Sequence, residues 1–145
     1  ALMLFESWAE GLPVSLMKSL VIDPNTRLIK AVRAMGVTVP IVGFPRGAGG
    51  ILEKYQQEVP VSAVGLDTAA VPEHVNAVLD PKVAVQGHLD PLVLIAGGKA
   101  LDEAVDALLA AYAHRPYIFN LGHGVRPETP ISHVERVVGR VRGKI

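Results

Sequence analysis

A single histidine, His123, stands between Gly122 and Gly124 in the segment 120–124, which follows the apolar run of residues 117–119. The apolar run predicts a strand. The histidine then follows the end of that strand, where its side chain is expected at the mouth of a cavity. Glycine can adopt a positive φ and lets a ligand approach the backbone closely, and histidine is the side chain that ordinarily changes charge near neutral pH. His123 is therefore a candidate site residue, with a solvated loop histidine as the plain alternative.

Polar side chains follow each of the expected strands. They are Glu6 and Ser7, then Arg46, then Asp67, then Gln86 with His88 and Asp90, and finally Asn120 with His123. In parallel α/β folds the carboxyl ends of the strands meet at one edge, where ligands bind, so this set predicts a binding mouth. The alternative is that turns are simply polar and glycine-rich, and an aspartate before a helix often serves only as its N-cap. For Gln86, His88 or Asp90 taken singly, the sequence favours that alternative.

Strand-like apolar runs alternate with helical patterns along the chain. The expected strands are residues 2–5, 39–44, 63–66, 83–86 and 117–120, and the expected helices are residues 15–21, 24–35, 51–57, 73–79, 99–113 and 131–141. Pro24 should divide the first helical stretch into two helices or one broken helix. The alternation predicts an α/β fold with a mostly parallel sheet covered on both faces.

Composition excludes several classes of function. The 145 residues fit one unit, and half of them are hydrophobic. Lysine plus arginine equals aspartate plus glutamate at 14 each, which argues against a nucleic-acid partner. The absence of cysteine excludes disulfides, thiolate metal sites and a cysteine nucleophile. Neither a membrane-spanning run nor a signal peptide is evident, so we expect a cytoplasmic protein without a membrane partner.

Five segments together carry a resemblance to a known family. They are Phe5-Glu6-Ser7-Trp8-Ala9, Gly43-Phe44-Pro45-Arg46-Gly47-Ala48-Gly49, Val64-Gly65-Leu66-Asp67, Val85-Gln86-Gly87-His88-Leu89-Asp90-Pro91 and Phe119-Asn120-Leu121-Gly122-His123-Gly124, the last followed by Pro127-Glu128-Thr129-Pro130. In order and spacing they resemble uroporphyrinogen decarboxylase across nearly the whole chain. Family members are longer and fold as a (β/α)8 TIM barrel. The resemblance therefore implies that residues 1–145 form a single unit, the carboxyl-terminal part of such a barrel, with no second domain.

The resemblance implies an enzyme that uses no cofactor and no metal. It would remove carbon dioxide from the four acetate side chains of uroporphyrinogen III and give coproporphyrinogen III for haem synthesis. In the family's usual mechanism a pyrrole ring, protonated at its α-carbon, accepts the electrons that carbon dioxide leaves behind. The protein must then supply a proton donor, cations for the carboxylates and an anion for the charged ring. For the intact protein the resemblance also implies a homodimer.

Two residues match the family's active-site motifs. Ser7 matches a serine that contacts the substrate, and His123 matches a histidine that acts as carboxylate partner or proton relay, which makes both candidate catalytic and substrate-binding residues. Arg46 is a candidate for substrate binding by its placement alone, because a guanidinium can hold an acetate or propionate bidentately. The family's arginine pair, pyrrole-binding aspartate and tyrosine would lie outside this chain. His88 stands where the family commonly has asparagine.

Two other interpretations remain open at this point. A corrinoid or thiol methyltransferase of the same barrel superfamily would normally bind zinc through histidine and cysteine, and the lack of cysteine disfavours it. A non-catalytic flavodoxin-like binding module would need only the five parallel strands, but the loop around Arg46 lacks the features of a phosphate loop. As part of a barrel, the chain should be inactive alone. Its open edges, at residues 2–5 and at the last strand, should pair with the missing amino-terminal half or drive self-association.

Overall fold

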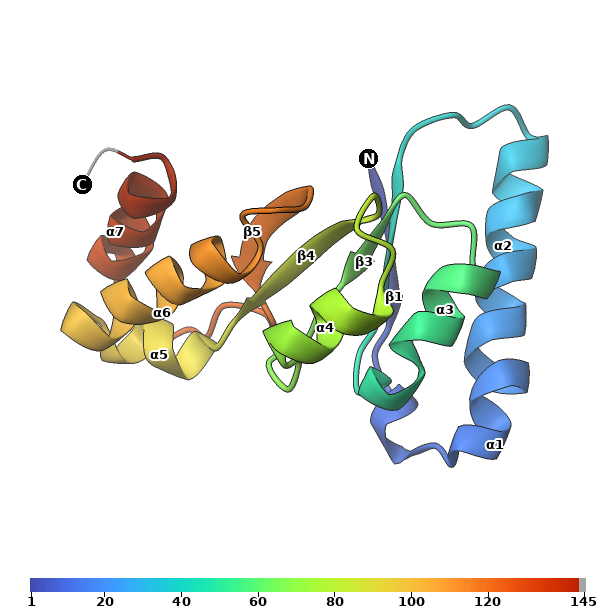
Figure 1. The fold of residues 1–145 in the computed structure, drawn as a ribbon, viewed down its shortest axis with the longest axis horizontal. Helices are drawn as coiled ribbons and strands as arrows, with labels where there is room; N and C mark the ends of the chain where they lie inside the picture. Colours follow the sequence, from blue (N-terminus) through green and yellow to red (C-terminus); the bar gives the residue numbers. More distant parts are fainter. Residues whose placement is uncertain (144–145) are drawn as a thin grey trace.

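The computed structural model describes residues 1–143 and shows strands alternating with helices (Figure 1). The strands are β1 (Leu2–Glu6), β2 (Ile41–Pro45), β3 (Ala63–Gly65), β4 (Ala84–Leu89) and β5 (Tyr117–Leu121). The helices are α1 (Val14–Met17), α2 (Asp23–Ala34), α3 (Leu52–Glu58), α4 (Pro72–Val78), α5 (Pro91–Ala96), α6 (Gly98–Ala111) and α7 (Ile131–Val141), with short turns η1 (Ala9–Gly11), η2 (Lys18–Ile22) and η3 (Gly49–Ile51). Over residues 1–143, no helix combines the length and the apolar character needed to cross a membrane.

The strands form one parallel sheet in which every strand lies beside its neighbour in the chain, in the order β1-β2-β3-β4-β5. Among the described residues β1 pairs only with β2 and β5 only with β4, so the sheet is an open arc with two free edges. This sequential order is that of a portion of a (β/α)8 TIM barrel. A flavodoxin-like sheet has the order 2-1-3-4-5, so the strand order argues against that alternative.

Two hydrophobic cores lie on the outer face of the arc, between the sheet and its helices. One joins Ile29 of α2 and Tyr55 of α3 to Ile41 of β2, and the other gathers side chains of β3 to β5 against α4 to α7, including Val64 and Val105. The inner face is not covered by helices, and Phe5 on it remains 63% exposed. The expectation of a sheet covered on both faces is therefore wrong for these residues, because in a barrel the inner face is covered by the opposite strands.

Pro24 does not separate two helices but follows a break within one helix, which is the second of the two expectations. The chain is helical from Val14 to Ala34, and its α-helical pattern is interrupted by the π-helical turn η2, which ends two residues before the proline. Within it the Asp23 N–H donates to the carbonyl of Lys18, five residues back. Proline lacks an N–H and its ring crowds the carbonyl four residues earlier, and the wider π turn accommodates both effects.

The strand β4 extends three residues beyond its expected end. It includes His88, although the sequence predicts a loop at that position. Helix α5 follows almost at once and was missed, although its signals are present: Asp90 is the N-cap and accepts the Leu92 N–H at 2.8 Å, and Pro91 is the first helical residue. Asp90 is thus the helix cap that the sequence analysis offered as its plain alternative.

Buried tyrosines make the fold sensitive to alkaline pH. Burial raises the pKa of Tyr55 and of Tyr112, each to about 12, whereas an unfolded tyrosine titrates near 10. The unfolded state thus loses these protons first, so the free energy of unfolding should be level up to about pH 10. Between about pH 10 and 12 it should fall by at most about 1.4 kcal/mol per pH unit for each tyrosine. Urea unfolding between pH 8 and 12 measures this slope. Tyr55→Phe should make it shallower, and an equal slope in that variant would contradict the assignment.

Candidate active site

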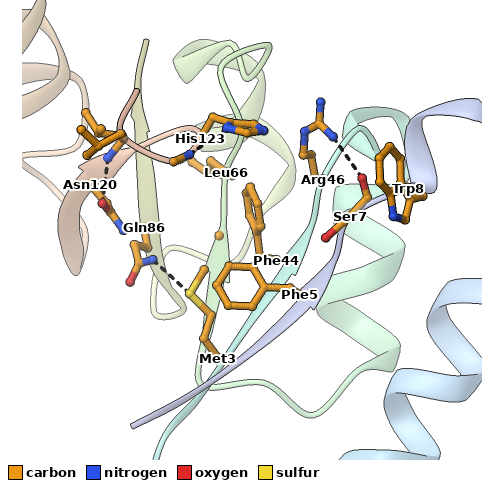
Figure 2. Close-up of a pocket in the computed structure, with 14 residues that line it drawn as sticks. Met3, Phe5, Ser7, Trp8, Phe44, Arg46, Leu66, Gln86, Asn120 and His123 are labelled. Carbon is orange, nitrogen blue, oxygen red and sulfur yellow. Dashed lines mark hydrogen bonds between the residues drawn. The ribbon is translucent and has the colours of Figure 1, made fainter. Parts of the chain in front are cut away.

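A cleft of about 620 Å³ opens on the inner face of the sheet, at the carboxyl ends of the strands (Figure 2). The polar side chains along it are Ser7, Arg46, Gln86, Asn120 and His123. Three of these are the residues that the sequence analysis selected as site candidates. They come from β1, β2 and β5, so the parallel pairing gathers them from opposite ends of the chain.

The guanidinium of Arg46 is held at the rim of the cleft beside Ser7. Its Nη1 donates to the carbonyl oxygen of Ser7 at 3.0 Å, and its Nη2 lies 3.2 Å from Oε2 of Glu10. The main-chain N–H of Arg46 also donates to the carbonyl of Glu6 at 3.1 Å, which continues the β1–β2 ladder into the loop. Arg46 is thus oriented before a ligand arrives. Its contact with Ser7 is to the main-chain oxygen, so it does not engage the serine hydroxyl.

His123 lies in the loop that follows β5 and is exposed on the opposite side of the cleft from Arg46 (Figure 2). Its Nδ1 accepts the N–H of Gly124 at 2.8 Å. An accepting Nδ1 carries no proton, so the neutral ring carries its proton on Nε2. That nitrogen is then a donor for a carboxylate oxygen of a ligand.

Gly122 places the histidine through close packing. Neither Gly122 nor Gly124 uses the positive φ that is open to glycine. A Cβ on Gly122 would lie 2.5 Å from the main-chain nitrogen of Thr68, and the Gly122 N–H donates to the carbonyl of Leu89 at 2.9 Å. Only a residue without a side chain lets the loop sit this close to the turn after β3.

The walls of the cleft are apolar, and sequence reasoning missed Met3, Phe5 and Phe44 among them. Phe5 and Phe44 meet edge to face with ring centroids 6.0 Å apart, and Met3 accepts a contact from Nε2 of Gln86 at 3.7 Å. The signal that could have found them is the two-residue alternation of a strand, which puts Met3 and Phe5 on one face. Trp8, exposed by 79%, adds a further apolar surface at the rim.

The other polar residues expected at the mouth do not line the cleft. His88 is buried on the helical side of the sheet with its Nε2 2.9 Å from Oη of Tyr112, and burial lowers the pKa of its imidazole. Asp90 caps α5, and Asp67 accepts main-chain N–H groups beside the cleft. Glu6 accepts the N–H of the residue two positions later in the chain. The prediction of a place in the binding mouth is therefore wrong for Glu6 and Asp67, whereas for His88 and Asp90, taken singly, the sequence favours a place outside it.

The arrangement suits a ligand with flat apolar rings and several carboxylates. Aromatic and aliphatic side chains would pack against the rings, while Arg46 and His123 would face carboxylates at the rim. Over residues 1–143, no group of three or more histidine, aspartate or glutamate side chains is placed to hold a metal ion.

Comparison with known proteins identifies the family. The family model for uroporphyrinogen decarboxylase (URO-D) matches residues 1–143. The chain belongs to the uroporphyrinogen decarboxylase family. Proteins named uroporphyrinogen decarboxylase from Hyphomonas neptunium, Caulobacter vibrioides and Maricaulis maris are 61%, 54% and 52% identical over 142, 144 and 143 residues. These matches cover 98% to 99% of this chain and 41% of each relative, so the chain spans about two fifths of their length.

Membership of the uroporphyrinogen decarboxylase family confirms the resemblance seen in the sequence. It also favours this interpretation over the methyltransferase. The partial coverage agrees with the open sheet, since a complete barrel closes on itself.

Gly122→Ala should destabilise this part of the uroporphyrinogen decarboxylase fold by about 1–3 kcal/mol, because the new methyl group overlaps main-chain atoms that cannot give way. Gly124→Ala is the matched control: no atom lies within 4 Å of its Cβ position, and the change should stay within about 0.5 kcal/mol. Urea unfolding of both variants measures the difference. Equal stability of the two variants would show that Gly122 is not held in this way.

Proposed function

We propose that the protein containing this chain removes carbon dioxide from the four acetate side chains of uroporphyrinogen III and yields coproporphyrinogen III in porphyrin and haem biosynthesis. The observation that carries the proposal is the single cleft that collects Ser7, Arg46 and His123 around apolar walls. Uroporphyrinogen presents the matching chemistry, with four pyrrole rings to pack against those walls and eight carboxylates for the polar rim. Family membership supports the same substrate class.

The proposed reaction needs no electron acceptor beyond the substrate. Protonation of a pyrrole α-carbon creates an iminium-like centre, and the electrons of the breaking carbon–carboxylate bond flow into it as carbon dioxide leaves. The resulting methylene takes up a proton to become methyl, and the α-carbon then loses the proton that it gained, which restores the pyrrole. In this scheme Arg46 binds an acetate or propionate carboxylate, and its guanidinium is already oriented by Ser7 and Glu10. His123 acts as carboxylate partner or proton relay through Nε2, and Ser7 contacts the substrate.

The complete enzyme requires more than these residues. In the proposal, residues 1–145 are one unit, the carboxyl-terminal portion of the barrel, and the two free sheet edges pair with the remaining strands. The isolated chain should be inactive and should either bind its missing amino-terminal half or self-associate. The intact enzyme is proposed to be a cytoplasmic homodimer that needs no metal or cofactor and has neither nucleic acid nor membrane as partner.

Decarboxylation should be observed directly with a full-length protein that contains this chain. Uroporphyrinogen III is incubated anaerobically with the protein and a metal chelator, and the oxidised porphyrins are separated by chromatography. Stepwise loss of carboxylates down to the four-carboxylate product is the expected result, whereas the isolated chain of residues 1–145 should leave the substrate unchanged. Unchanged substrate with the full-length protein would contradict the proposal and favour the methyltransferase.

His123→Asn should lower kcat by about 10²-fold or more, because the amide cannot relay a proton. Ser7→Ala should lower kcat/KM by about 10-fold through the loss of one hydrogen bond. The matched control is His114→Asn, at an exposed histidine after α6 that does not line the cleft. Steady-state kinetics on uroporphyrinogen III measure all three. If His123→Asn behaves like His114→Asn, the role assigned to His123 is wrong.

A further inference from the structure

Asp67 lies at the centre of the strand ends yet does not line the cleft. It follows β3, the middle strand of the sheet, after Leu66, whose N–H donates to the carbonyl of Gln86 at 2.7 Å. The carboxylate faces a separate cavity of about 80 Å³, behind the loop that carries Arg46. The group is therefore placed to hold main chain rather than to touch a ligand in the cleft.

One oxygen of this carboxylate holds the Arg46 loop. Oδ2 of Asp67 accepts the N–H of Gly47 at 2.6 Å. Gly47 has a φ of +76°, and a Cβ there would lie 2.1 Å from Cβ of Glu10. The peptide directly after Arg46 is thus clamped between the Asp67 carboxylate and the η1 turn, whose Glu10 also pairs with the Arg46 guanidinium.

The other oxygen shapes the turn on which the His123 loop rests. Oδ1 of Asp67 accepts the N–H of Ala69 at 2.9 Å, and the carbonyl of Asp67 accepts the N–H of Ala70 at 3.0 Å. Gly122 packs directly against this turn, because its Cβ position lies 2.8 Å from the carbonyl carbon of Asp67. His123 is the next residue in the chain.

We propose that Asp67 is a positioning residue that sets the separation between Arg46 and His123 across the cleft. Its two carboxylate oxygens hold the loop after β2 and the turn after β3. The loop after β5 is positioned by close packing against that turn. The inference deepens the proposed function and rests on the roles assigned there to Arg46 and His123. A carboxylate suits the task because it accepts two N–H groups at once, and charge-assisted hydrogen bonds are short and strong.

Asp67→Asn tests the inference with little change in shape, because the amide can accept only one of the two N–H groups and turns its own NH₂ toward the other. In a full-length protein containing this chain, kcat/KM for uroporphyrinogen III should fall by about 10²-fold, the size of effect that a misplaced reacting group produces. The matched control is Asp80→Asn, an exposed loop aspartate whose Oδ1 also accepts a main-chain N–H, that of Lys82 at 2.8 Å. It lies before β4, at the opposite ends of the strands, and should leave kcat and KM unchanged.

Hydrogen–deuterium exchange without substrate separates this inference from the proposed function. In the unaltered protein the Gly47 amide should exchange slowly. In Asp67→Asn, exchange should accelerate in peptides covering residues 46–48 and also in those covering 122–124, which Asp67 does not hydrogen-bond. A merely stabilising residue would lower Tm while leaving kcat and KM of the folded enzyme as they were. Rapid exchange at Gly47 in the unaltered protein, or unchanged exchange at 122–124 in the variant, overturns the inference whether or not the protein decarboxylates uroporphyrinogen.

Discussion

The parallel pairing of strands that are consecutive in the chain is the constraint on which the site depends. It sends each connecting helix to the outer face and brings all carboxyl strand ends to one edge. The β1–β2 register places Glu6 opposite Pro45, so Ser7 and Arg46 enter their loops side by side. The β4–β5 register places Leu89 opposite Leu121, and the same ladder then continues to the N–H of Gly122. A one-residue slip in either pair would turn the polar groups away from the cleft.

The two faces of the sheet have different energetic roles. The outer face holds the arc together, because side chains such as Val64 and Val85 are fully buried against the helices. The inner face keeps Phe5 and Ile118 at 63% and 45% exposure. Burying a large apolar side chain stabilises a protein by roughly 1.5–3 kcal/mol. Association with a partner that covers the inner face is therefore favourable. Phe5 is thus both a wall of the cleft and part of the apolar surface that the described residues leave exposed.

The sequence predicted the strands, most helices and, by motif or placement, the cleft residues Ser7, Arg46 and His123, but not the features that depend on distant partners. From the sequence, the polar His88 is expected in a loop. In the structure it lies within β4, because Tyr112 at the far end of α6 provides a hydrogen-bond partner for its imidazole. Likewise Gly122 suggests a backbone conformation that only glycine adopts. The structure instead requires glycine there because the main chain of Thr68, more than one strand away, leaves no room for a side chain. Met3 and Phe5 follow the strand alternation and could have been assigned to the inner face, had the sheet been recognised as covered by helices on one side only.

The ion pair between Arg46 and Glu10 orients a charged group while leaving it able to bind a ligand. The guanidinium is 26% exposed and the glutamate 54% exposed, and such solvent-exposed pairs contribute about 0–1 kcal/mol. Their value here is geometric, because Glu10 and the carbonyl of Ser7 fix the direction of the guanidinium at little energetic cost. In the proposed reaction a substrate carboxylate can share or replace Glu10 on Arg46 with only a small penalty. The loop around Arg46 then has no need to move, since Asp67 and Gly47 already hold its main chain in place.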